Sequence, residues 1–165
     1  MAPSPSSSLL TQPIPAPALQ RFAEFRVLVD RPQDAGTGPR GQRRLIPILG
    51  GEAAGDGWRG RILPGGADVQ RISEDGLSDL DARYIVETDA GDLLYIHNLA
   101  LRSGPAEAMA RLARGEPVDP ALIYFRGTPR IETSSSTLNW VNHRLFVCTG
   151  ARYPDRVELE FFVLA

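Results

Sequence analysis

The most constraining feature of this sequence is a series of short segments in which apolar and polar residues alternate, each closed by a turn rich in Gly, Asp or Pro. In 157–163, every second residue from Val157 is apolar, and Glu158 and Glu160 occupy alternate positions. Alternation with a period of two is typical of a strand with one buried face. The expected strands are 19–30, 43–51, 58–66, 67–73, 80–89, 93–101, 121–127, 129–134, 144–150 and 156–164, and 32–42 is expected to form a turn.

Only one segment favours a helix. Residues 103–117 are rich in alanine, with Pro105 suited to the first helical position and Gly115 to the residue just past the end. Its buried stripe is expected to contain Met109, Leu112 and Ala113. A parallel α/β fold needs a helix between most of its strands, so the pattern predicts an all-β sandwich or barrel of about eight to ten strands.

The chain of 165 residues is long enough for one domain with a buried core. Residues 1–18 are rich in Pro and Ser and are expected to form a disordered tail before a single domain at 19–165. The tail lacks the basic start and continuous apolar stretch of a signal peptide, and no apolar run reaches the roughly 20 residues of a membrane helix. Together with a single cysteine, Cys148, these observations predict a cytoplasmic protein.

Charge and ligand chemistry narrow the expected partners. A formal net charge of -2 gives no electrostatic reason to expect a nucleic acid or a membrane as a partner. Arg40, Arg43 and Arg44 form the densest basic group, which is expected to be hydrated because a few arginines near a Gly-rich loop are usually solvated. His97 and His143 lie far apart and show no metal-binding spacing, so we expect no metal and no cofactor.

The segment ILPGGADVQRI at 62–72 interrupts strand-like sequence with two glycines and an aspartate. It is followed by another strand and contains no lysine, which argues against a phosphate-binding loop. One interpretation is a β-bulge or tight bend and nothing more. The other is that the bend directs Asp68 and Gln70 into a pocket, because residues i and i+2 share a face of a strand.

A second charged segment leaves the same choice open. In 81–88, Asp81, Arg83 and Glu87 share a face with Ile85, and the other face is less polar. The charged face is either the solvated exterior of a sheet or the inside of a barrel that binds a ligand. Further polar residues recur in the later segments, each with an ordinary structural explanation: Asn98, Tyr124, Arg126, Glu132, Trp140 and Asn142. Together these groups supply the components of an acid–base site for a small organic molecule.

Several motifs, in order, resemble one known family. They are GQRRLIPILGG, PGGAD, DARY, NLALR, GEPVDP, YFR with a downstream ET, WVN and FVCTGAR. The sequence from about Arg21 onward is similar to the family called domain of unknown function 3237, or uncharacterised protein family 0311. One departure is Val69, where the family commonly has Trp and where a change in a pocket wall is expected.

The resemblance implies an antiparallel β-barrel similar in build to small-ligand and allene-oxide-cyclase-like barrels. Most bacterial members have no assigned activity, whereas some fungal relatives are associated with ring-forming steps that add a hydroxyl across an alkene. The resemblance therefore implies motif positions and a style of reaction, but no established catalytic residues.

The leading hypothesis is a small-molecule-binding barrel, with a cofactor-free lyase, isomerase or cyclase activity as one form of it. Asp68 or Glu132 would be the general acid or base. The expected ligand-binding residues are Gln70, Arg83, Asn98, Tyr124, Arg126, Trp140 and Asn142. Arginines would hold an anionic or carbonyl group, Tyr124 and Asn98 would donate hydrogen bonds, and Trp140 would form an apolar wall. The alternatives are a non-catalytic carrier or sensor of a hydrophobic or aromatic metabolite, and a structural module; a homo-oligomer is expected in each case.

Overall fold

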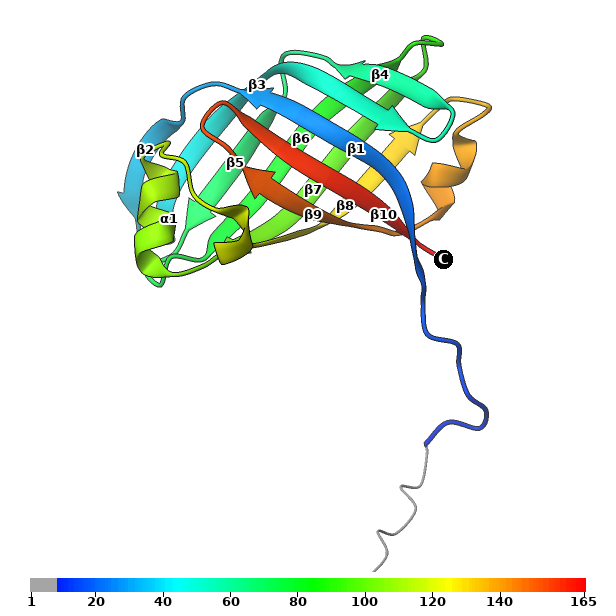
Figure 1. Cartoon of the computed structure of the whole chain (residues 1–165), viewed down its shortest axis with the longest axis horizontal. Coiled ribbons are helices and arrows are strands. Elements are labelled where there is room, and N and C mark those ends of the chain that lie inside the picture. The colour runs from blue at the N-terminus through cyan, green and yellow to red at the C-terminus, as the bar shows by residue number, and fades with distance from the viewer. Residues whose placement is uncertain (1–8) are drawn as a thin grey trace, which may run out of the picture.

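The computed structural model describes residues 9–165, which form a β-barrel with one α-helix (Figure 1). Residues 1–8 lie outside the described residues, so the disordered tail predicted at 1–18 stays a prediction. The strands are β1 (Leu19–Val29), β2 (Gln33–Gly38), β3 (Gly41–Gly55), β4 (Trp58–Ile62), β5 (Ala67–Ile72), β6 (Ser78–Thr88), β7 (Leu93–Ser103), β8 (Tyr124–Thr133), β9 (Phe146–Arg152) and β10 (Arg156–Leu164). The helices are α1 (Ala106–Ala113) and the 3-10 turns η1 (Pro120–Leu122) and η2 (Asn139–His143).

All strand pairs are antiparallel, and the sheet closes on itself. Its order runs β1-β10-β9-β8-β7-β6-β4-β3-β2, and an additional pairing of β1 with β3 closes the circuit. β4 and β5 both lie between β3 and β6, so they share one of eight positions around the barrel. β2 pairs with β3 beyond the circuit. Closure leaves almost no free sheet edge, which is how antiparallel sheets of this size avoid edge-to-edge association.

The Gly-Gly segment joins β4 to β5 within that shared position. Ile62 pairs with Gly51 and Val86, and Ala67 pairs with Pro47 and Arg83, so the linking residues outnumber those opposite them. Gly65 has a φ of +109°, and a Cβ on Gly66 would lie 2.4 Å from the Arg83 carbonyl oxygen. Glycine is therefore required here by backbone conformation and by close approach, as in a β-bulge.

The inner faces of the strands form one core. Its most deeply buried side chains include Phe25 and Phe161, whose rings stack with centroids 4.2 Å apart, and Leu94 and Ile96, both 0% exposed. α1 lies at one end of the barrel and η2 at the other (Figure 1). Ala108, Leu112 and Val118 form a small cluster of their own at the α1 end. The helix thus packs as a cap with a cluster of its own, which the partly buried Ile123 links to the main core.

The predicted antiparallel barrel with one short helix is confirmed, and the corrections concern its details. Residues 32–42 are not only a turn, because β2 pairs with the first part of β3. The two strands expected within 121–134 are one strand, β8. The helix begins at Ala106 with Pro105 as its N-cap, and it buries Ala108 and Leu112 while Ala113 is exposed.

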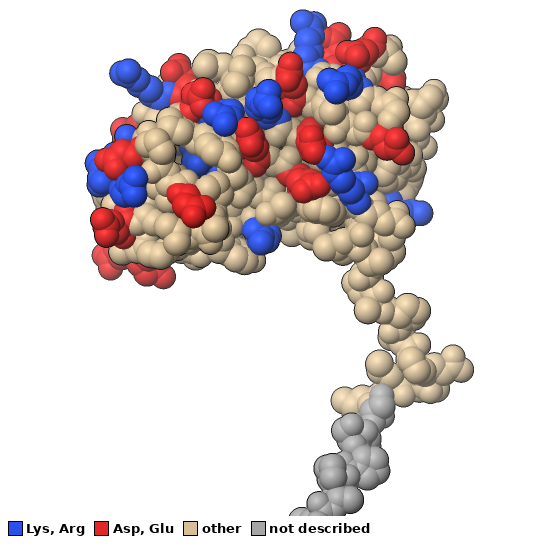
Figure 2. Space-filling model, in the orientation of Figure 1, with Lys and Arg blue, Asp and Glu red and all other residues tan. Residues whose placement is uncertain are grey.

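No helix in the described part of the chain is long and apolar enough to cross a membrane. On the face of the barrel drawn in Figure 2, acidic and basic side chains are interspersed and no patch of a single sign forms. Several of these charges are paired across β3, β1 and β10, where Arg26 lies between Glu52 and Glu158. Such exposed pairs contribute only a few tenths of a kcal/mol each.

Candidate functional site

The barrel interior contains a cavity of about 40 Å³ toward the α1 end. Asp68, Gln70, Tyr84, Asn98, Arg102 and Arg152 contribute its polar lining. The remaining lining is apolar: Val27, Val29, Ile46, Ile48, Leu80, Ala82, Ala100, Phe125, Val157 and Leu159. A cavity of this size holds a few water molecules or one small functional group. The polar groups therefore converge on a confined, largely apolar space.

Asp68 and Gln70 point into this cavity from β5, immediately after the bulge. The amide Nε2 of Gln70 donates to Oδ2 of Asp68 at 2.8 Å. Oδ1 of Asp68 and Oε1 of Gln70 are buried without a hydrogen-bond partner. Burial raises the pKa of Asp68, an effect that the Gln70 hydrogen bond and the positive charges of Arg102 and Arg152 oppose. The carboxyl group is therefore set to hold a proton more readily than an exposed aspartate.

Three buried arginines surround this end of the interior. Arg44 on β3 is 8% exposed, Arg102 on β7 is 5% exposed and Arg152 on β9 is 9% exposed. Arg44 Nη2 lies 3.4 Å from the carbonyl oxygen of Ala113, at the end of α1. The Arg102 guanidinium lies 5.6 Å from the centre of the Phe125 ring. The expectation that Arg44 would be hydrated was wrong, because Arg44 lies on the inner face of β3 with Ile46 and Ile48.

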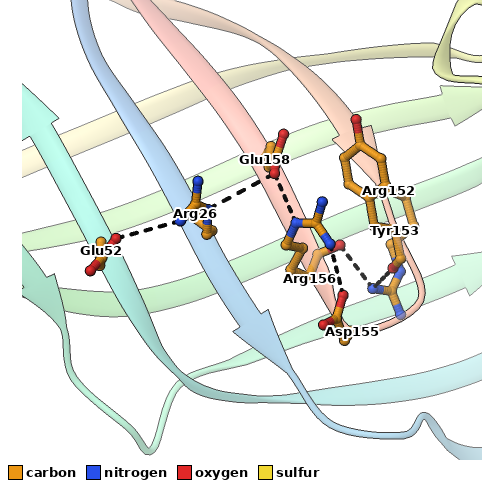
Figure 3. A network of polar contacts seen from close by, with 7 residues as sticks. All are labelled: Arg26, Glu52, Arg152, Tyr153, Asp155, Arg156 and Glu158. Atoms are coloured by element: carbon orange, nitrogen blue, oxygen red, sulfur yellow. Dashed lines mark hydrogen bonds and ion pairs between the residues drawn. The ribbon is translucent and has the colours of Figure 1, made fainter.

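The β9–β10 turn fixes Arg152 (Figure 3). Its Nη1 donates to the carbonyl oxygens of Tyr153 and Arg156, the latter at 3.1 Å. Arg156 in turn covers the ring of Tyr153 at 4.2 Å and pairs with Asp155 and Glu158. The guanidinium of Arg152 is thus held by backbone oxygens, which carry no full charge that could neutralise it.

Two further polar side chains lie deeper in the barrel. Tyr84 is 3% exposed, and its hydroxyl has no hydrogen-bond partner. Burial raises the pKa of this phenol, which therefore stays protonated. Asn98 Nδ2 lies 3.4 Å from the Cys148 thiol, and burial raises the pKa of that thiol to about 11. The thiol is therefore a packing group at neutral pH rather than a nucleophile.

Electrostatically, the interior is dominated by positive charge. Burial, together with the neighbouring charges of Arg152 and Arg44, lowers the pKa of Arg102 to about 10, against the attraction of Asp68. Burial also lowers the pKa of Arg152. At neutral pH three guanidinium groups remain charged beside one carboxyl group. The site therefore carries a charge of +2 or +3, depending on whether Asp68 has lost its proton.

The charged face of β6 lies on the outside of the barrel. Arg83 is exposed and contacts Asp81, with its Nε 3.2 Å from Oδ1. His97 on β7 contacts the same oxygen from Nε2 at 3.0 Å. Tyr84 and Val86 occupy the inner face instead. The structure therefore does not bring Arg83 together with Asp68, and the face matches the solvated exterior of a sheet.

The other predicted site residues divide between inside and outside. Asn98 is inside with Asp68 and Gln70. Tyr124, Arg126 and Glu132 are exposed on β8, and Arg126 donates to Thr149 Oγ1 at 2.9 Å. Trp140 and Asn142 lie in η2 at the opposite end, where Trp140 meets Phe22 edge-on with ring centroids 5.5 Å apart. Val69 is 43% exposed on the outer face, so this position does not form a wall of the interior.

Sequence reasoning missed Arg44, Arg102, Arg152 and Tyr84. A signal was present for Arg102, because it lies four residues after Asn98 on the same face of one strand. Within the described part of the chain, no group of three or more His, Cys, Asp or Glu side chains is placed to hold a metal ion.

The chain is similar to known proteins over most of its length. The family described as "Protein of unknown function (DUF3237)" matches residues 17–164. A UPF0311 protein of Rhodopseudomonas palustris is 49% identical over 120 residues, covering 73% of this chain and 78% of its own length. A UPF0311 protein of Clostridium acetobutylicum is 40% identical over 125 residues, covering 76% of this chain and 79% of its own.

Solved structures agree with the barrel. A Rhodopseudomonas palustris protein of unknown function superposes with a TM-score of 0.86 at 40% identity, covering 92% of this chain and 99% of its own. A β-barrel-like protein of Acinetobacter baumannii gives 0.82 at 37% identity, covering 94% and 100%. An enzyme from Penicillium herquei gives 0.70 at 19% identity, covering 95% and 100%, a likeness that extends to the fold alone. The match over 17–164 and these relatives show that the chain belongs to the DUF3237 family, also called UPF0311.

Proposed function

We propose that this protein binds a small organic molecule at the α1 end of the barrel and transfers a proton to or from it through Asp68. The activity would be that of a lyase, isomerase or cyclase that works without a cofactor. The observation that carries this proposal is the buried, unpartnered Oδ1 of Asp68, which faces a cavity lined by both polar and apolar groups.

Asp68 has the properties required of a general acid or base. Burial raises its pKa, while Gln70 occupies the other carboxyl oxygen and so orients the group. A carboxyl group with a raised pKa is a better general acid than an ordinary, fully ionised aspartate. Glu132, the other predicted acid or base, is exposed on β8, so the geometry favours Asp68.

Access to the site requires movement at the α1 end, because 40 Å³ is smaller than a whole metabolite. α1 is the element suited to move, since its buried residues Ala108, Leu112 and Val118 form a small cluster that the partly buried Ile123 links to the main core. Elements with few buried contacts open at a lower free energy than the core around them. A ligand would enter as this cap lifts and would have its reactive group enclosed when the cap returns.

The likeness to the Penicillium herquei enzyme supports a catalytic role for such a barrel, although it reaches only the fold. The arginines favour a second candidate, a carrier that binds without turnover. Arg102 and Arg152 stabilise the ionised form of Asp68 and thus oppose its protonation. The two candidates differ in whether a proton is exchanged with the bound molecule.

The test uses the protein as purified from cells. Native mass spectrometry identifies a retained molecule, and incubation in D₂O then reports whether deuterium enters that molecule faster with protein than without. We expect retention and catalysed exchange by the wild type, retention without exchange by Asp68→Asn, and both by the outer-face control Asp81→Asn. Retention with no exchange by the wild type would favour the carrier. Equal exchange by Asp68→Asn would refute the proton-transfer role.

A further inference from the structure

We propose that the ligand of this site is an organic carboxylate, held by Arg102 and Arg152 with Arg44 at the entrance, and that its apolar part lies against the barrel wall. This inference rests on the proposed function, because it names the class of molecule bound at the same site. It assigns three arginines that the proton-transfer role of Asp68 does not use.

The α1 end of the interior holds more buried positive charge than negative charge. Arg44, Arg102 and Arg152 are each at least nine-tenths buried. Among the described residues, Asp68 is the one carboxyl group that lines the cavity beside Arg102 and Arg152. In the described part of the chain, none of the three guanidinium groups forms an ion pair with a carboxylate. Buried charges in proteins are normally paired, because removing an ion from water is costly. The missing counter-charge is at least one anion.

Two of the buried arginines also have hydrogen-bond donors without a partner. The Nε atoms of Arg44 and Arg102 are buried without a partner, although a guanidinium group has five N–H donors. The side chains come from three separate strands and meet at one end of the interior. There Arg44 and Arg152 lower the pKa of Arg102, and Arg44 lowers the pKa of Arg152. Donors that converge in this way from different elements fit a planar, bidentate acceptor such as a carboxylate.

The apolar lining of the cavity suits the rest of such a ligand. Beyond the polar groups the cavity wall consists of aliphatic residues and Phe125, whose ring lies beneath the Arg102 guanidinium. A fully hydrated inorganic anion gains nothing from such a wall, whereas an aromatic or branched carboxylic acid gains free energy by burying its apolar surface. The geometry therefore favours an organic carboxylate over inorganic phosphate.

The test compares three probes by isothermal titration calorimetry on the full chain: benzoate, the neutral analogue benzamide, and inorganic phosphate. We expect benzoate to bind and benzamide to bind at least about 30-fold more weakly, because it cannot compensate the buried positive charge. If phosphate binds and benzoate does not, the assignment of an organic ligand is overturned, and the site binds inorganic anions only. Equal binding of benzamide and benzoate, or binding of none of the three, would overturn the proposal.

Variants locate the site. Arg102→Met should lower benzoate affinity at least about 30-fold, while Arg83→Met, a matched change on the outer face, should leave it unchanged. Arg102→Met should also leave the midpoint of urea unfolding unchanged or higher, since it removes an uncompensated buried charge. A variant that unfolds more easily and still binds benzoate would show that Arg102 is structural and would refute the inference.

Asp68→Asn separates this inference from the proposed function. The substitution removes a negative charge beside the arginines, so benzoate should bind at least as tightly as to the wild type. If proton exchange fails while benzoate binds through Arg102, the carboxylate site stands and the catalytic role falls. If exchange depends on Asp68 but benzoate does not bind, the catalytic role stands and the carboxylate assignment falls.

Discussion

Two opposing effects act on the carboxyl group of Asp68, and their balance predicts how this residue affects stability. Burial raises its pKa above the ordinary 3.8, and the Gln70 hydrogen bond and nearby arginines reduce that rise. The folded state therefore binds this proton more tightly than the unfolded state does. By linkage, the contribution of Asp68 to stability falls as the pH rises from about 3.8 through the folded-state pKa, and it stays lost above that value.

Asp68→Asn should thus stabilise the protein relative to wild type at pH 7, and the gain should disappear below pH 4. Urea unfolding at several pH values measures the difference. Asp81→Asn is the control with the opposite sign, because the hydrogen bond from Arg83 lowers the pKa of Asp81. Its substitution should cost stability at pH 7 and little at low pH. A gain from Asp68→Asn that does not vary with pH would contradict the electrostatic explanation.

At the scale of residues, the sequence predicted some polar positions of the interior and not others. Asp68, Gln70 and Asn98 could be predicted, because a carboxylate or amide in a strand-like segment is unusual enough to suggest a site. Arg152 could not, because a charged residue in an alternating strand is normally solvated. Arg102 was missed although it shares an inward face with Asn98. Which face turns inward depends on barrel closure, and that is decided by pairings between segments far apart in sequence.

Among the elements, the bulge between β4 and β5 determines where Asp68 points. Gly66→Ala would place a Cβ 2.4 Å from the Arg83 carbonyl oxygen and 2.7 Å from Tyr84 Cβ, so backbone must move. We expect a loss of about 1–3 kcal/mol in the free energy of unfolding, measured with urea. Gly38→Ala is the control: its Cβ meets nothing within 4 Å, and the change should stay within about 0.5 kcal/mol. Equal effects of the two would show that the bulge is not constrained by packing.

α1 is the second element whose role can be tested. Leu112→Ala removes the largest side chain of the helix cluster, and we expect faster hydrogen exchange at the α1 amides with less than about 1 kcal/mol lost in global stability. Leu94→Ala, in the main core and 0% exposed, should instead lose about 2–5 kcal/mol globally. A cooperative loss of the whole barrel in Leu112→Ala would contradict the separation of cap and core.

The elements themselves were largely predictable from period-two alternation, since β1, β6, β7 and β10 bury every second side chain over most of their length. Two regions were not. β2 is exposed throughout, so no burial pattern marks it as a strand. In β8 the Gly127-Thr128-Pro129 sequence suggested a turn, whereas pairing with β7 carries the strand through it.

Along the axis of the whole molecule, the barrel divides into two halves. Toward η2 the interior is apolar and includes Leu94, Ile96 and Phe161, all 0% exposed. Toward α1 it holds the arginines and Asp68. β7 shows the change within one strand, because its inward residues run from Leu94 and Ile96 through Asn98 to Arg102. Stability should therefore come mainly from one half, and ligand binding from the other.

Two substitutions test this division. Phe161→Ala removes a ring stacked on Phe25, so it should lower the free energy of unfolding by about 3–5 kcal/mol while benzoate affinity of the folded fraction stays within about threefold. Arg102→Met should instead lower benzoate affinity and leave stability unchanged or higher. If Phe161→Ala leaves too little folded protein for titration, Ile96→Val, with an expected loss of about 0.5–1.5 kcal/mol, replaces it. Because each variant serves as the other's control, a joint loss of stability and binding in both would mean that the interior acts as one unit, and the assignment of binding to the α1 half would fail.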